Sequence, residues 1–208
     1  MHSNDWEETL GTAVPDEKAA AVLEAMRRRP REDFLPTMRQ HEARYDRPVD
    51  IGYGQTNSQP STVANMLWLL DVQPGQTVLD LGAGSGWSTA ILGDLVGESG
   101  SVLGLEIVPE LVEAAQKVLE RQNMSWIGMQ LATDQTLGSP QHAPFDRILV
   151  SAEATDLPAE LVEQLGPQGI MVIPVAGQML RVLRQSENPD DVEISQHGAY
   201  RFVALRSS

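Results

Sequence analysis

The chain has 208 residues, no cysteine and a formal net charge of −14 at pH 7. This length suits one domain with a sizeable core, and the lack of cysteine excludes disulfides, thiolate metal sites and a cysteine nucleophile. The four histidines are scattered along the chain, so we expect no metal site. The acidic charge argues against a nucleic-acid partner, because binding to a phosphate backbone needs a basic face.

No apolar run approaches the roughly 18 residues that a membrane span requires, so we expect no membrane partner. Residues 1–8 are polar and acidic and lack the basic start and the apolar stretch of a secretion signal. We therefore expect a cytoplasmic protein. The sequence does not determine the oligomeric state, although a monomer is the simplest expectation.

The first third of the chain predicts two helices separated by an irregular segment. A helix is expected from Asp16 to Arg29, because apolar residues recur at helical spacing and Pro30 ends the pattern. Residues 31–57 carry prolines and glycines and are expected to be irregular. Pro60 suits the first turn of a second helix, which has four apolar residues on one side: Val63, Met66, Leu67 and Leu70.

From residue 78 onwards, short apolar strands alternate with helices, which is typical of a parallel sheet with helices on both faces. The last two predicted strands, 179–183 and 199–205, are joined by a polar loop and predict an antiparallel pair at the sheet edge. We therefore expect an α/β, doubly wound, mostly parallel sheet. The other predicted strands are 78–81, 102–106, 126–131, 147–150 and 170–173, and the predicted helices begin near residues 87, 109 and 158.

The strongest local signal is a glycine-rich loop between a strand and a helix, with glycines at 82, 84 and 86 after an acid at Asp80. Glycines let the backbone turn tightly and approach a ligand closely. The next strand ends at Glu106, whose carboxylate can accept both hydroxyls of a ribose. A nucleoside ligand is therefore expected, with Asp80, Gly82, Gly84, Gly86 and Glu106 as binding residues.

Two nucleoside ligands compete for this loop. A dinucleotide site requires a third glycine at a position that Trp87 occupies here. S-adenosylmethionine carries a sulfonium and an ammonium group but no phosphate, so Asp80 suits it and would repel a pyrophosphate. Asp134 follows another predicted strand at the same sheet edge and would accept from the adenine amino group; its alternative role is that of a turn residue. A glycine turn without a ligand is the remaining alternative.

The residues upstream of the glycine loop resemble the protein-L-isoaspartate (D-aspartate) O-methyltransferase family. The stretch from Gly54 to Pro60, Gly-Gln-Thr-Asn-Ser-Gln-Pro, carries the most specific part of this resemblance. The similarity extends in order over nearly the whole chain, through Arg31–Pro36, Tyr45–Pro48, Ile51–Pro60, Val78–Gly86, Glu106, Pro144–Asp146, Leu165–Pro174, Gln178–Leu180 and Phe202–Leu205.

The resemblance implies a single domain over residues 1–208 of the class I S-adenosylmethionine-dependent methyltransferase type. Its sheet would have seven mostly parallel strands, an antiparallel strand at the C-terminal edge and an N-terminal helical extension. Residues 1–72 would form the acceptor side and residues 73–208 the cofactor-binding core. The implied activity is methyl transfer from S-adenosyl-L-methionine to the free carboxylate of L-isoaspartyl and D-aspartyl residues in damaged proteins, which initiates their repair.

The resemblance also implies site residues. Ser58 matches the residue that the family uses to hold the acceptor carboxylate, although the sequence without this resemblance favours a residue at a helix start. The implied cofactor contacts, beyond those of the glycine loop, are Gln59, Pro60, Ser61, Thr62, Asp134, Gln135 and Gln178.

Five positions depart from the pattern of the family. Asn57 replaces an aliphatic residue beside Ser58, Thr133 and Gln135 replace glycines, and Ala204 replaces a proline. Glu153 stands where small residues are typical; facing inwards it would repel a carboxylate, and on the surface it would be neutral. Two alternatives to isoaspartyl methylation therefore stay open: a methyltransferase for another acceptor, and a non-catalytic protein that binds the cofactor or a damaged peptide.

Overall fold

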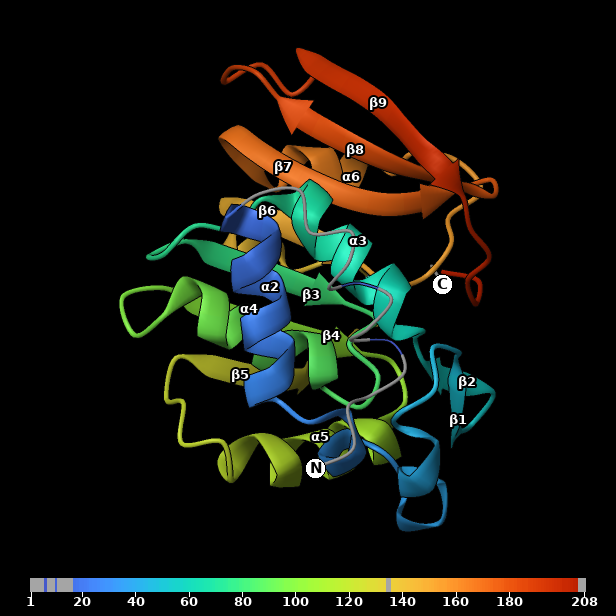
Figure 1. Cartoon of the computed structure of the whole chain (residues 1–208). Coiled ribbons are helices and arrows are strands. Elements are labelled where there is room, and N and C mark those ends of the chain that lie inside the picture. Colours follow the sequence, from blue (N-terminus) through green and yellow to red (C-terminus); the bar gives the residue numbers. More distant parts are fainter. Residues whose placement is uncertain (1–5, 7–9, 11–16, 134–135, 206–208) are drawn as a thin grey trace.

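The structure is a computed structural model that describes residues 6, 10, 17–133 and 136–205 (Figure 1). Its centre is a seven-stranded sheet in the order β5-β4-β3-β6-β7-β8-β9. The first five strands of this order run parallel, and β8 and β9 are antiparallel additions at one edge. The strands are β3 (Thr77–Leu81), β4 (Ser101–Glu106), β5 (Ile127–Leu131), β6 (Phe145–Val150), β7 (Leu165–Val175), β8 (Gln178–Arg184) and β9 (Val192–Ala199).

Helices cover both faces of the sheet because successive strand residues point to opposite sides. Val78 belongs to the core that contains side chains of α2 (Glu17–Arg28), α3 (Pro60–Leu70) and α4 (Trp87–Val96). Its neighbour Leu79 belongs to the opposite core, to which α6 (Ala159–Glu163) contributes. Figure 1 shows α2, α3 and α4 together in front of the sheet. The expected doubly wound, mostly parallel fold with a helical N-terminal extension is confirmed.

The segment that the sequence predicts to be irregular contains regular structure. Two short 3₁₀ helices, η1 (Arg31–Phe34) and η2 (Thr37–Glu42), precede an antiparallel hairpin of β1 (Val49–Gly52) and β2 (Gln55–Asn57). Val49 and Ile51 pack against Leu111 of α5 (Pro109–Glu120). The strands are only four and three residues long, and glycines at both ends of the turn hide them from a pattern search.

The position of the last strand was predicted wrongly. β9 is Val192–Ala199, not 199–205. Elsewhere, η3 (Pro140–His142) is a further short 3₁₀ helix. β9 is an edge strand with several exposed polar side chains, so it lacks the apolar alternation of a half-buried strand. The apolar residues 202–205 instead form a segment that pairs through Ala204 with Glu153, in the loop that follows β6.

No helix in the described part of the chain is long and apolar enough to cross a membrane.

Candidate active site

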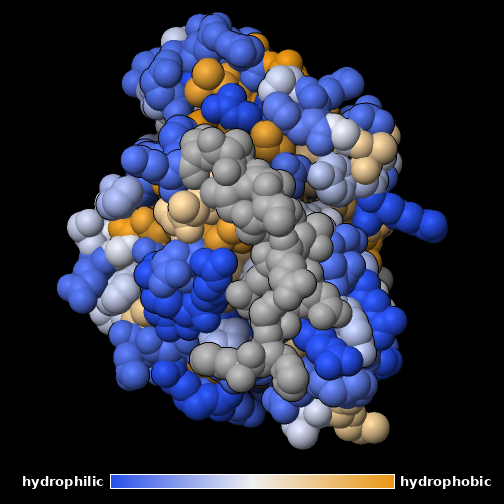
Figure 2. Space-filling model, in the orientation of Figure 1, coloured by the Kyte–Doolittle hydropathy of each residue, from blue (hydrophilic) through white to orange (hydrophobic). Residues whose placement is uncertain are grey.

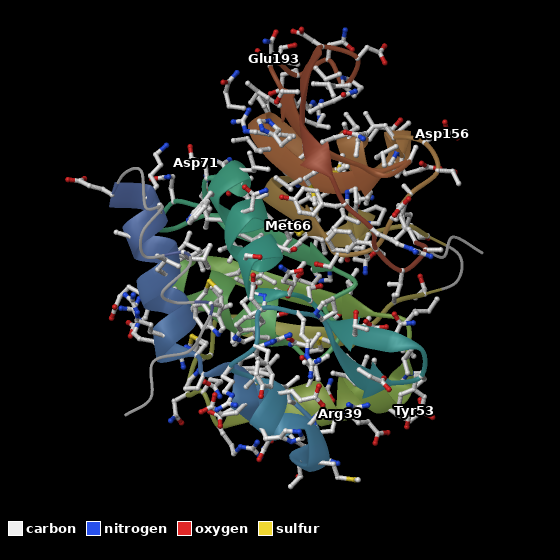
Figure 3. The ribbon with its side chains drawn as sticks, turned by 45° about the vertical axis from the view of Figure 1, so that its right-hand side comes forward. Arg39, Tyr53, Met66, Asp71, Asp156 and Glu193 are labelled. Carbon is white, nitrogen blue, oxygen red and sulfur yellow. The ribbon has the colours of Figure 1, made fainter. Side chains whose placement is uncertain are left out.

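A cavity of about 550 Å³ opens at the carboxyl ends of the parallel strands. Open α/β sheets bind ligands at this edge, and pockets of this volume hold small molecules. Figure 3 shows the hairpin with Tyr53 on one side of this edge, the loop with Asp156 on the other, and Met66 of α3 between them. The wall is formed by residues 55–58, 63, 66, 81–85, 87–88, 106–107, 132–133, 136–138, 149, 151–160 and 203–205.

The glycine loop that follows β3 forms one wall of the cavity. Gly82, Gly84 and Gly86 all have positive φ, at 78°, 54° and 81°, which L side chains rarely adopt. Gly82 and Gly84 line the cavity, whereas Gly86 does not. A Cβ on Gly86 would lie 3.3 Å from the Cβ of Ala115. The first two glycines therefore leave room for a ligand, and the third allows α5 to pack against the loop.

Glu106 ends β4 on the cavity wall and is held there by three backbone N–H groups. Its Oε2 accepts from Gly84 at 3.0 Å, and its Oε1 accepts from Ile107 and Val108 at 2.8 and 3.0 Å. The side chain is only 5% exposed. Each carboxylate oxygen can accept more than one hydrogen bond, so Glu106 retains capacity to accept from ligand hydroxyls.

Asp80 lies beneath the glycine loop, outside the cavity lining, and is fully buried. Its Oδ2 accepts from the hydroxyls of Ser88 and Thr89, both at 2.7 Å. Its Oδ1 has no hydrogen-bond partner among the described residues. Burial raises the pKa of Asp80 to about 6, against the lowering effect of the two hydroxyls, and the nearby Glu106 raises it further. A nearby cation would stabilise a buried carboxylate oxygen that has no hydrogen-bond partner.

Ser58 lines the cavity immediately after β2, where the chain turns into α3. The next four residues do not line the cavity. Gln59 and Ser61 are instead joined to Asp46, which accepts from the Gln59 amide at 3.0 Å and from the Ser61 backbone N–H at 2.9 Å. Pro60 is buried at the first turn of α3, and Thr62 is half-buried. Ser58 is thus presented on a turn that its neighbours fix.

Arg31 is the residue that organises this turn, and the sequence did not identify it as a site residue. Its guanidinium is 2% exposed and donates to the backbone carbonyls of Tyr45, Arg47, Asn57 and Ser58 at 2.9 to 3.1 Å. It also lies over the ring of Trp87, 5.5 Å from its centroid. Burial lowers the pKa of Arg31 to about 10, so the cation persists at neutral pH.

Three other sequence-predicted positions lie away from the cavity lining or outside the described residues. Asp134 and Gln135 belong to the undescribed part of the chain. Gln178 begins β8, where it pairs with Val175 and Ala199, and it does not line the cavity.

The Glu153 side chain neither points a free carboxylate into the cavity nor lies on the open surface. It is half-buried and borders the cavity, but its carboxylate binds backbone. Oε1 accepts from Gly177 at 3.1 Å and Oε2 accepts from Phe202 at 3.2 Å. Its backbone also pairs with Val203 and Leu205. Glu153 therefore fastens the C-terminal segment, whose residues 203–205 form part of the cavity wall.

The sheet order, the glycine loop and the acid at the end of the second parallel strand together define the class I methyltransferase fold. The chain belongs to the protein-L-isoaspartate(D-aspartate) O-methyltransferase family, whose sequence model matches residues 14–208.

Relatives and solved structures agree with this membership. The chain is 46% identical to the protein-L-isoaspartate O-methyltransferase of Aeropyrum pernix, over 84% of this chain and 67% of the relative. It is 47% identical to that of Methanothrix thermoacetophila, over 88% and 87% of the two chains. A crystal structure of a Plasmodium falciparum protein described as this methyltransferase, in complex with S-adenosyl-L-homocysteine, covers both chains fully with a TM-score of 0.85. Its identity of 23% supports the fold alone.

Proposed function

We propose that the protein transfers the methyl group of S-adenosyl-L-methionine to the free carboxylate of L-isoaspartyl and D-aspartyl residues in damaged polypeptides. Membership of the family is the observation that carries this proposal. Two features agree with an adenosyl ligand that bears positive charge. Glu106 lines the cavity and retains capacity to accept from hydroxyls such as those of a ribose. Beneath the glycine loop, the buried Oδ1 of Asp80 lacks a hydrogen-bond partner among the described residues.

When bound, S-adenosyl-L-methionine supplies an electrophilic methyl group on a sulfonium. The acceptor carboxylate is ionised at neutral pH, so the protein needs no general base. Its task is to align the acceptor oxygen with the methyl group and to keep water away. We assign the alignment to Ser58, whose hydroxyl would hydrogen-bond the acceptor carboxylate. We assign the cofactor side to Gly82, Gly84 and Glu106.

The two halves of the chain would then have different tasks. Residues 1–72 contribute Gln55 to Ser58, Val63 and Met66 to the wall, and we assign them to the acceptor side. Residues 73–208 contribute the strand ends and the glycine loop, and we assign them to cofactor binding. Residues 203–205 are the exception, since they come from the second half and border the cavity beside Glu153.

The deciding experiment uses two synthetic peptides that differ only in one linkage, an L-isoaspartyl residue in one and a normal L-aspartyl residue in the other. With a methyl-labelled cofactor, we expect label in the isoaspartyl peptide alone, in a base-labile ester. Label in neither peptide, from a protein that binds the cofactor, would favour a non-catalytic binding protein. Label in both peptides would favour a different acceptor.

A further inference from the structure

Asn57 joins the acceptor side of the cavity to the glycine loop. It ends β2, is 5% exposed and lines the cavity beside Ser58. Its Oδ1 accepts from Nε of Arg31 at 2.7 Å, and its Nδ2 donates to Oγ of Ser85 at 3.0 Å. One side-chain amide therefore connects the buried guanidinium that holds the Ser58 turn to the loop expected to hold the cofactor.

The chemistry of Arg31 fixes the direction of both bonds. A guanidinium has only donors, so the amide must turn its oxygen towards Arg31 and its NH₂ group towards Ser85. Arg31 is itself held in its position, because four backbone carbonyls accept from its other nitrogens. The Asn57 amide can therefore not flip without leaving a buried donor unpaired, which costs about 1–3 kcal/mol.

The direction of these bonds determines what Ser85 can do. Its oxygen accepts from Asn57, so its own proton remains available to donate. No acceptor for this proton occurs among the described residues, and Ser85 is half-buried on the cavity wall. The chain of donors, from the Arg31 cation through the Asn57 amide to the Ser85 hydroxyl, is polarised towards the cavity.

The described lining of the cavity contains no Lys, Arg or His side chain. An anionic group bound there must therefore be recognised by hydroxyl and N–H donors. We propose that Ser85 donates its hydroxyl proton to a carboxylate bound in the cavity, and that Asn57 is the positioning residue that directs this proton. The proposal rests on the proposed function, which brings two carboxylates into the cavity: that of the amino-acid part of the cofactor and that of the isoaspartyl acceptor.

The test compares Ser85→Ala, Asn57→Asp and the double variant with the parent protein. Ser85→Ala removes the donor. The carboxylate introduced by Asn57→Asp still accepts from Arg31, but it also accepts the Ser85 proton and so turns that proton away from the cavity. Asn65→Asp is the matched control, because it adds the same charge on α3 at a residue that does not line the cavity and whose amide donates to Tyr200. Thermal unfolding of each variant confirms that it is folded.

Calorimetry measures the affinity for S-adenosyl-L-homocysteine and for 5′-methylthioadenosine, which lacks the amino acid and its carboxylate. If Ser85 binds the carboxylate of the cofactor, both single variants weaken S-adenosyl-L-homocysteine about 10- to 100-fold, as for one hydrogen bond to a charged group, and leave methylthioadenosine unchanged. If Ser85 binds the acceptor, both affinities stay constant and the KM for the isoaspartyl peptide rises by the same factor. Asn65→Asp should match the parent in either case.

The double variant separates positioning from simple charge repulsion. If Asn57 acts through Ser85, Asn57→Asp has little further effect once the hydroxyl is gone. If Asn57→Asp weakens binding in the Ser85→Ala background as much as it does in the parent, the positioning role is overturned. Unchanged affinity and KM in Ser85→Ala would overturn the whole proposal. A parent that methylates no isoaspartyl peptide, but whose affinity for S-adenosyl-L-homocysteine depends on Ser85, would refute the proposed function and leave this inference standing.

Discussion

The turn that carries Ser58 is held by hydrogen bonds to its backbone and to its neighbours, not by bonds to the Ser58 hydroxyl. Arg31 donates to the Ser58 carbonyl at 2.9 Å, and Asp46 binds Gln59 and Ser61 on the following turn. These contacts hold the backbone of Ser58 and do not depend on its hydroxyl. Loss of the hydroxyl should therefore affect the acceptor more than the fold or the cofactor.

We predict that Ser58→Ala binds S-adenosyl-L-methionine within a few-fold of the parent. Its kcat/KM for an isoaspartyl peptide should fall about 10- to 1000-fold, the loss expected for one orienting hydrogen bond in the transition state. Calorimetry and steady-state kinetics on the same preparation check the two parts. Turnover equal to that of the parent, from a folded and cofactor-bound variant, would remove Ser58 from the catalytic machinery.

Asp80 should make the stability of the ligand-free protein depend on pH. Its pKa is about 6 in the folded protein and about 3.9 in an unfolded chain. Well below pH 4 the group is protonated in both states. Between pH 4 and pH 6 the unfolded chain loses this proton while the folded protein keeps it, so stability falls as the pH rises and is lowest above pH 6.

Asp80→Asn should remove this dependence. The difference in unfolding free energy between parent and variant should change by about 2 kcal/mol between pH 4 and pH 7, with the parent losing stability relative to the variant as the pH rises. Any cost of the buried amide is the same at both values and cancels. Urea denaturation at the two pH values measures the change. A pH-independent difference would mean that Asp80 titrates normally.

At the scale of elements, the loop that follows β6 holds two other parts of the fold through Glu153. The carboxylate of Glu153 accepts from Gly177, in the turn between β7 and β8, and from Phe202, in the C-terminal segment. A carboxylate can accept on both oxygens, whereas an amide accepts on one only. The presence of an acid at position 153 is therefore explained by these two hydrogen bonds, without any role for the charge of the acceptor.

We predict that Glu153→Gln destabilises the protein by about 1–3 kcal/mol, because one of the two N–H groups loses its acceptor. The amide of Phe202 should exchange with solvent faster than in the parent, and β3 should keep its protection. Hydrogen exchange resolved by residue is the measurement. A drop in the KM for acidic peptides, with exchange at Phe202 unchanged, would restore the view that Glu153 repels the acceptor.

The sequence predicts elements well where burial imposes a period, and poorly where it does not. β3, β4 and α5 were predicted to within a residue or two, because their apolar residues follow the spacing of a buried strand or an amphipathic helix. β9 was missed because an exposed edge strand carries no such signal. The hairpin of β1 and β2 was missed because its two strands are shorter than any reliable pattern.

The residues of the candidate site also fall into those that the sequence predicted and those that it did not. The glycine loop and Glu106 were predicted from local order along the chain, and the structure places Gly82, Gly84 and Glu106 on the cavity wall. Arg31 and Ser85 escaped attention because their roles depend on contacts across 26 and 28 positions to Asn57. An arginine after a helix and a serine among glycines carry no local sign of such contacts.

At the scale of the whole molecule, charge is the dominant feature. The formal net charge is −14, and Figure 2 shows hydrophilic side chains over most of the described surface on the face that carries α2 and β9. The cavity lining repeats this bias, with Glu106, Glu153, Asp156 and Glu160 and no cationic side chain among its described residues. Asp156 and Glu160 are exposed, so they face any polypeptide that approaches.

We therefore predict that the sequence around the isoaspartyl residue affects binding through charge. At low ionic strength, a peptide with lysines flanking that residue should have a lower KM than one with glutamates, since opposite charges attract and like charges repel. The difference should shrink as salt is raised to about 0.5 M, because the screening length falls from about 10 Å at 0.1 M towards a few ångströms. The double variant Asp156→Asn, Glu160→Gln should reduce the difference at low salt while leaving the affinity for S-adenosyl-L-homocysteine unchanged. Equal KM values for the two peptides at low salt would show that the acidic mouth does not select the acceptor.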